Sequence, residues 1–143
     1  MADDDRYRPA PVRDARARNE HVKRGELAGA VDDAREAQHR LAELHAHTAA
    51  ALTALTASLA ARDAQPTAAR RALADRFVAR RRRELATAAD DEARAAAALE
   101  TRAGAVDAAR RTLARARADR EVIERHFARW REQRRKLAER RED

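Results

Sequence analysis

The two halves of the chain meet at the segment Arg62-Asp63-Ala64-Gln65-Pro66-Thr67, which interrupts a seven-residue pattern of small and apolar side chains. Proline lacks an amide hydrogen and clashes with the preceding helical turn. Pro66 therefore fits the first turn of a new helix but not the interior of an old one. We expect the chain to reverse direction here, with a turn at about 64–66.

A heptad pattern precedes this segment. Its positions alternate steps of four and three residues, which places them on one face of a helix over about 13–63 and predicts a coiled-coil seam. The positions are Leu27, Val31, Ala34, Gln38, Leu41, His45, Thr48, Leu52, Leu55 and Leu59. We expect the polar members Gln38, His45 and Thr48 to help fix the register.

A second heptad pattern follows the segment and predicts a longer helix over about 67–140. It needs no skip over about nine heptads, which favours left-handed supercoiling. One row is Val78, Leu85, Glu92, Leu99, Val106, Leu113, Arg120 and Phe127. The other row is Ala74, Arg81, Ala88, Ala95, Arg102, Ala109, Ala116, Ile123, Trp130 and Leu137.

These patterns predict an all-α fold, a long antiparallel two-helix coiled-coil hairpin with unequal arms. Pro9 and Pro11 lie close together, so we expect residues 1–12 to be a flexible lead and residues 13–143 to form one hairpin. The isolated protein is expected to be a monomer or a weak homodimer.

The inequality of the arms predicts an uncovered end. With a turn centred near Pro66, position i of the first helix faces about 133 − i, so this helix runs out opposite about residue 120. Several apolar side chains beyond that point should be partly exposed, with Arg134 in their basic rim. They are Val122, Ile123, Phe127, Trp130 and Leu137. In the alternative arrangement the lead folds back, with Tyr7 and Val12 packing on Trp130.

The composition limits the function classes. The chain of 143 residues contains no cysteine, and it combines 40% charged residues with only 3% aromatic residues. Its five histidines lack the spacing that places two ligands on one helical face, and no glycine-rich phosphate loop is present. We therefore expect no catalytic residue, no metal and no cofactor. No apolar run approaches the length that spans a bilayer, which favours a cytoplasmic protein without membrane insertion.

The positive charge suggests nucleic-acid binding as a second function class. The net charge is +7; residues 1–65 are near neutral, and residues 66–143 carry 22 basic against 14 acidic side chains. The run Arg80-Arg81-Arg82-Arg83 fans out around the helix and has no interleaved aromatic residues to stack on bases. We expect only nonspecific nucleic-acid binding at low salt. A basic nucleoid or DNA-associated coiled coil, or a generic coiled-coil scaffold, stays as the alternative.

The whole pattern resembles a known family. The chain is basic and has no cysteine. It combines a short lead, two long predicted heptad helices and an Arg/Glu-rich end from Glu121 onward. It is similar to the central stalk proteins of type III secretion systems and bacterial flagella, the FliJ and SctO proteins. The stretch from Tyr7 to Arg18 and the segment Arg71-Ala72-Leu73-Ala74-Asp75-Arg76-Phe77 are similar to the Hrp-type members.

The resemblance implies specific partners. Such stalks insert the end that carries both termini into a hexameric export ATPase and contact the export gate protein through the rest of the hairpin. The implied ATPase-facing residues are Ile123, Phe127 and Trp130 with nearby arginines. The implied gate-facing residues are Leu73, Phe77 and Arg80. The implied location is the cytoplasmic side of a membrane export apparatus.

Overall fold

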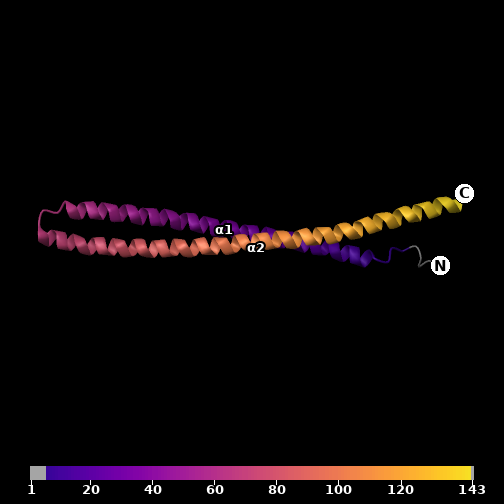
Figure 1. The fold of residues 1–143 in the computed structure, drawn as a ribbon, viewed down its shortest axis with the longest axis horizontal. Coiled ribbons are helices and arrows are strands. Elements are labelled where there is room, and N and C mark those ends of the chain that lie inside the picture. The colour runs from indigo at the N-terminus through magenta and orange to yellow at the C-terminus, as the bar shows by residue number, and fades with distance from the viewer. Residues whose placement is uncertain (1–5, 143) are drawn as a thin grey trace. The chain divides into compact units, whose positions relative to one another are not determined.

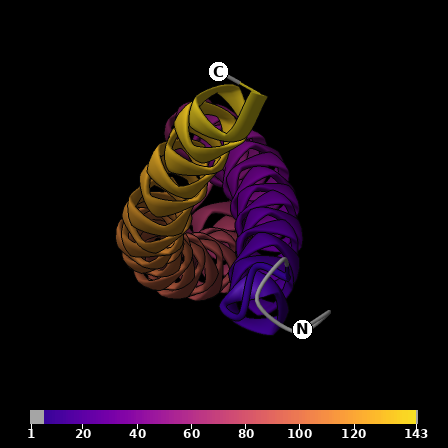
Figure 2. The ribbon, with the colours of Figure 1, turned by 90° about the vertical axis from the view of Figure 1, so that its right-hand side faces the viewer.

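The computed structural model describes residues 6–142, which form two helices, α1 (Ala10–Asp63) and α2 (Ala68–Glu142). Figures 1 and 2 show the two helices side by side with opposite chain directions, and no strand occurs among residues 6–142. α1 has 54 residues and α2 has 75. The predicted all-α antiparallel hairpin with unequal arms is confirmed.

α1 begins at Ala10, three residues earlier than expected. Pro11 lies in the first helical turn, where amide hydrogens have no partner within the helix, so its missing N–H costs little. The carbonyl of Pro9 accepts hydrogen bonds from the amides of Val12 and Arg13, both at 3.0 Å. Residues 6–12 of the expected lead thus contain a buried Tyr7 and the start of a helix. Residues 1–5 lie outside the described part of the chain.

The reversal occupies residues 64–67. The hydroxyl of Thr67 accepts a hydrogen bond from the amide of Arg70 at 3.3 Å, which caps the first turn of α2. Pro66 therefore precedes the cap and lies outside the helix. Arg71 donates to the carbonyl of Gln65 at 3.0 Å, which ties α2 to the turn.

The chain divides into two compact units, and both helices run through both of them. The first, which we call the turn unit, is Asp32–Gly104. The second, the terminal unit, combines Met1–Val31 with Ala105–Asp143.

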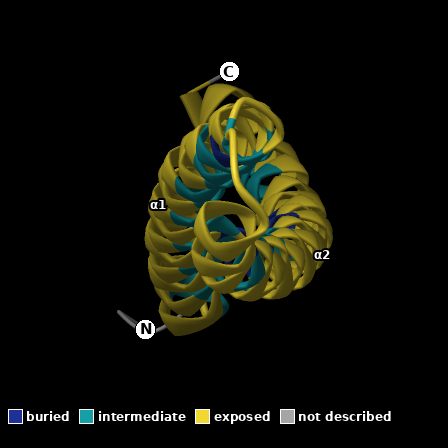
Figure 3. Ribbon diagram, turned by 90° about the vertical axis from the view of Figure 1, so that its left-hand side faces the viewer, coloured by how far each residue is buried: buried dark blue, intermediate teal, exposed yellow. Residues whose placement is uncertain are grey.

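The seam of α2 follows the two predicted rows. In the turn unit Val78, Ala88 and Ala95 are buried, and Ala88 is only 1% exposed. In the terminal unit the buried members are Val106, Leu113, Ala116 and Ile123. Figure 3 shows buried and half-buried residues where α1 and α2 face each other and exposed residues outside. Long charged or terminal members of the rows, namely Arg102, Arg120 and Leu137, stay exposed.

The seam of α1 differs from the prediction in one of its two rows. The row that contains Leu27, Leu41 and Leu55 is half-buried, as expected. The second row does not contain Gln38, His45 and Leu52, which are exposed. It lies one residue earlier along the chain, at Ala30, Ala37, Leu44, Ala51 and Ser58. Both rows satisfy an alternation of three and four, and packing selects the row with smaller side chains because these allow the axes to approach closely.

The register also differs from the prediction. Ion pairs between the helices show that position i of α1 lies opposite about 137 − i in each unit. The pairs are Arg62 with Asp75, His45 with Glu92, and Arg13 with Glu124. The expected value of 133 is therefore wrong by four residues, roughly one helical turn. As a result α1 reaches about residue 127 of α2 instead of residue 120.

Candidate functional site

An aromatic cluster closes the end of the terminal unit. Tyr7 is only 6% exposed, and its ring centroid lies 4.9 Å from that of Phe127 and 5.2 Å from that of Trp130. Its hydroxyl lies 2.9 Å from Nδ1 of His126. The alternative in which the lead folds back is thus confirmed for Tyr7, whereas Val12 is 46% exposed.

Arg13 joins this cluster to a carboxylate. Its Nε donates to Oε1 of Glu124 at 2.8 Å, and its guanidinium carbon lies 4.2 Å from the centroid of Phe127. This hydrogen bond, with the arginine charge, lowers the pKa of Glu124. The start of α1 is therefore fastened to α2 by a stacked and hydrogen-bonded arginine.

Glu20 is a buried carboxylate that the heptad pattern did not predict. It is 5% exposed, and it accepts hydrogen bonds from Arg120 at 2.9 Å and Arg24 at 2.7 Å. The hydrogen bond from Arg120, followed by the surrounding arginine charges, lowers its pKa against the opposing effect of desolvation. A signal was available, because Glu20 lies seven residues before Leu27 and Arg120 occupies a predicted seam position. Such a buried charge pair favours one register over others.

The expected ATPase-facing side chains divide into covered and exposed ones. The expectation that Ile123 is exposed is wrong, since only 8% of it is accessible. Phe127 and Trp130 are half-buried because Tyr7 packs on them. Val122 at 60% and Leu137 at 47% are exposed, so every one of these side chains except Ile123 is at least partly exposed, as expected. The covered part is larger because α1 extends one turn further and the lead adds Tyr7.

The final twelve described residues of α2 extend beyond the aromatic cluster. Residues 131–142 are exposed apart from Arg134, which is half-buried. They contain six arginine or lysine residues and three glutamates, with Leu137 as their one large apolar residue. We call this segment, together with Val122 and the accessible edges of Phe127 and Trp130, the terminal surface.

The expected gate-facing residues form an exposed patch near the turn. Leu73 is 68% exposed and Phe77 is 47% exposed, and their spacing of four places them on one face of α2. The guanidinium carbon of Arg81 lies 4.9 Å from the centroid of Phe77. Arg80 is exposed beside them. We call Leu73, Phe77 and Arg80 the turn surface.

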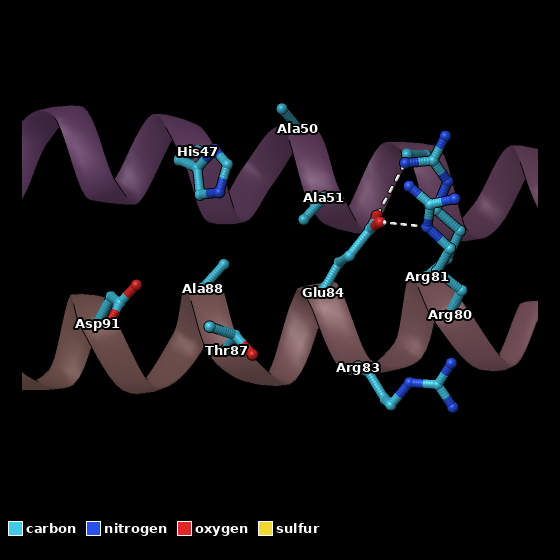
Figure 4. Close-up of a pocket in the computed structure, with 11 residues that line it drawn as sticks. His47, Ala50, Ala51, Arg80, Arg81, Arg83, Glu84, Thr87, Ala88 and Asp91 are labelled. Atoms are coloured by element: carbon cyan, nitrogen blue, oxygen red, sulfur yellow. Dashed lines mark hydrogen bonds and ion pairs between the residues drawn. The ribbon is translucent and has the colours of Figure 1, made fainter.

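Three arginines of the run after Phe77, namely Arg80, Arg81 and Arg83, line one shallow groove beside Glu84, and Arg82 does not. Arg80 and Arg81 both bind Glu84, at 3.0 and 2.8 Å, and these hydrogen bonds lower the pKa of Glu84. In Figure 4 both arginines turn toward Glu84, whereas Arg83 points away from α1. The expectation that the run fans out without sharing a groove is therefore met only by Arg82. The apolar part of the groove lining consists of alanines of both helices.

The expectation that His45 occupies the seam is also wrong. Its side chain is 75% exposed, and Nδ1 lies 2.7 Å from Oε1 of Glu92. This contact, with a further hydrogen bond from Thr48, lowers the pKa of Glu92. His45 therefore bridges the helices from beside the seam instead of filling it.

Neither a protein-family model, nor a curated protein, nor a solved structure matches this chain. Within residues 6–142, neither helix has an apolar stretch long enough to cross a bilayer. The same part of the chain has no group of three His, Asp or Glu side chains placed like metal ligands. The resemblance to the stalk proteins therefore stays a prediction.

Proposed function

We propose that this chain is a non-enzymatic central stalk protein of a type III secretion export apparatus. In this role it binds the hexameric export ATPase and the export gate protein from the cytoplasmic side of the membrane. The resemblance supplies the partners, and the hairpin fold is compatible with them. The observation that carries the proposal is the terminal surface, where α2 continues beyond the aromatic cluster as an exposed basic helix.

The terminal surface has the features of an ATPase-binding end. Val122 and Leu137 offer apolar contact, and the basic residues around Leu137 give a positive rim. An apolar anchor with a charged rim is typical of protein interfaces, and the positive rim favours an acidic groove on the partner. Ile123 and Tyr7 lie beneath this surface, so their role is to hold Phe127 and Trp130 in place.

The turn surface is the proposed gate-binding site. Leu73 and Phe77 expose large apolar side chains that the hairpin itself does not cover. Stacking of Arg81 on Phe77 fixes the ring in one orientation, which lowers the entropy lost on binding. The surface thus presents a preorganised aromatic anchor beside a basic residue, Arg80.

Removal of residues 131–143 tests the proposal. This truncation spares Tyr7, Phe127 and Trp130, so the hairpin should keep its helicity and its cooperative unfolding while binding to the hexameric export ATPase is lost. Binding is measured by titration calorimetry with the purified ATPase. The matched control is Leu73→Ala in the full chain, which should leave ATPase binding unchanged and weaken gate binding. Unchanged ATPase binding by the truncated chain would contradict the proposal.

A basic DNA-associated coiled coil is the second candidate function. It is favoured by Arg70, Arg76 and Arg82 near the turn, which have no ion pair within residues 6–142. Unpaired arginines on a helix surface suit phosphate contacts. Sequence-selective DNA binding that survives physiological salt would favour this candidate over the stalk.

A further inference from the structure

The turn unit has an apolar groove along one side of the seam. It is a shallow depression of about 630 Å³, lined mainly by alanine and leucine side chains of both helices, with Gln38, His45 and Glu92 as its polar members. Leu52, which is 54% exposed, belongs to the same row of α1 as Gln38 and His45. This side of the turn unit therefore leaves apolar surface of both helices uncovered.

The apolar face of α1 is wider than a two-helix contact requires. A two-stranded coiled coil uses two of every seven positions, whereas a helix in a bundle uses three. α1 fills its seam with the rows of Leu41 and Leu44. In the turn unit it still carries a third row on the groove side, with the polar Gln38 and His45 followed by Leu52 and Leu59. The two leucines of this row widen the apolar face of α1 near the turn.

A strip on α2 along the groove is complementary to an antiparallel copy of itself. It consists of Arg82, Ala86, Ala89, Ala93, Ala96 and Glu100, all exposed and spaced by four and three residues in alternation. The central positions are alanines, and the two ends carry opposite charges. An antiparallel copy of the strip would place alanine against alanine and each arginine against a glutamate.

The charges at the two ends of the strip are unused within the chain. Arg82 and Glu100 have no ion pair among residues 6–142. On the opposite side of the seam the acidic groups are satisfied: Glu84 binds Arg80 and Arg81, as Figure 4 shows, and Asp91 binds Arg94. The side with the apolar groove is thus also the side with unpaired, complementary charges.

We infer that a second copy of this chain docks on the groove in an antiparallel, two-fold symmetric arrangement. In this dimer Arg82 faces Glu100 of the partner subunit, and Ala89 faces Ala93 of the partner subunit. The four helices of the two turn units form a bundle. Alanine contacts let the two α2 helices approach closely, and each residue pair occurs twice because the interface is isologous. The inference does not depend on the proposed function.

Sedimentation velocity on the full chain tests the dimer. Ala93→Glu places a charge at the centre of the alanine strip and should raise the dimer dissociation constant by more than about tenfold, because a buried unpaired charge is costly. The matched control is Ala98→Glu on the opposite side of the seam, which should leave the constant unchanged. Circular dichroism should show equal helicity for both variants. A chain that stays monomeric at all concentrations, or a dimer that tolerates Ala93→Glu, would overturn the inference.

Charge exchange tests the antiparallel orientation. Arg82→Glu and Glu100→Arg should each weaken self-association, because each creates two like-charge contacts in a symmetric dimer. An equimolar mixture of the two variants should form heterodimers at least about tenfold tighter than either homodimer, since opposite charges then meet at both ends. No preference for the heterodimer would overturn the arrangement.

Discussion

The hydroxyl of Tyr7 lies 2.9 Å from Nδ1 of His126, across 119 residues of sequence. This contact joins the lead to the end of α2, beside the aromatic stack of Phe127 and Trp130. The terminal unit is therefore closed at its end by a residue that precedes α1.

Substitutions of Tyr7 should destabilise the terminal unit in two steps. Tyr7→Phe removes the hydrogen bond and should lower the free energy of unfolding by about 0.5–1.5 kcal/mol. Tyr7→Ala also removes the contacts with both aromatic rings and should cost at least about 2 kcal/mol. Urea unfolding followed by fluorescence measures both effects, because Trp130 is the single tryptophan of the chain. Val12→Ala is the control, and it should change the stability by less than about 0.5 kcal/mol.

The stability of the terminal unit should fall on acidification. The pKa of Glu20 is lowered in the folded state, chiefly by its hydrogen bond from Arg120. A depressed folded pKa stabilises the fold above the unfolded value of about 4.3, and this contribution disappears as the pH falls through the folded pKa. Glu20→Gln should remove this part of the pH dependence and weaken the fold at pH 7.

Urea unfolding at a series of pH values between 2 and 7 measures the effect of Glu20. Glu26→Gln is the matched control, because Glu26 is an exposed glutamate that pairs with Lys23 on the helix surface. A variant Glu20→Gln whose stability follows the same pH curve as the native chain would contradict the assigned role.

Enlargement of a buried seam alanine should lower the stability much more than the same change at an exposed alanine. Ala88 is 1% exposed, so Ala88→Leu should overpack the contact and cost about 1–3 kcal/mol. Ala97 lies nine residues later on the exposed side, and Ala97→Leu should change the stability by less than about 0.5 kcal/mol. Thermal unfolding followed by circular dichroism compares the two. Equal effects would be incompatible with the observed seam.

Periodicity predicted the two helices, their reversal and both seam rows of α2, because these depend on local spacing alone. It could not choose between the two α1 rows that flank Leu41. The row with Leu44 and Ala51 and the row with His45 and Leu52 have the same spacing. The choice depends on the size of the opposing α2 side chains and thus on the register, which the position of Pro66 fixes only to within a helical turn.

The prediction of the candidate site depended on that register more strongly than the prediction of the fold did. A shift of four residues extends α1 toward Phe127 and brings Tyr7 onto Trp130. Ile123, which the sequence pattern left uncovered, is buried for this reason. A long-range contact of a single aromatic residue leaves no periodic pattern in the sequence. The packing of Tyr7 on Trp130 could therefore be predicted only as one of two alternatives.

DNA binding by the native chain should be weak and salt-sensitive. The arginines near the turn can contact phosphates, and such contacts release counterions, so affinity should fall steeply with salt and vanish near physiological ionic strength. Fluorescence anisotropy with two duplexes of unrelated sequence measures this, and both should bind equally. A clear preference for one duplex at physiological salt would contradict the prediction.

A single substitution in the terminal surface, at Leu137, tests the stalk proposal. Leu137 is 47% exposed and lies beyond the aromatic cluster, so it can be changed without disturbing Tyr7 or Trp130. Leu137→Glu should weaken binding to the hexameric export ATPase by more than about 1 kcal/mol, because it replaces the apolar anchor by a charge that an acidic groove repels. Its thermal stability should equal that of the native chain.

The control for Leu137→Glu is Ala138→Glu, which adds the same charge at the neighbouring position and so changes the net charge equally. If the apolar contact of Leu137 is the anchor, Leu137→Glu should weaken ATPase binding considerably more than Ala138→Glu does. Equal losses would show that the charge of the segment alone governs binding, in which case the basic rim is the binding element and Leu137 is not its anchor. Full binding by both variants would move the ATPase contact away from the terminal surface, toward Leu73 and Phe77.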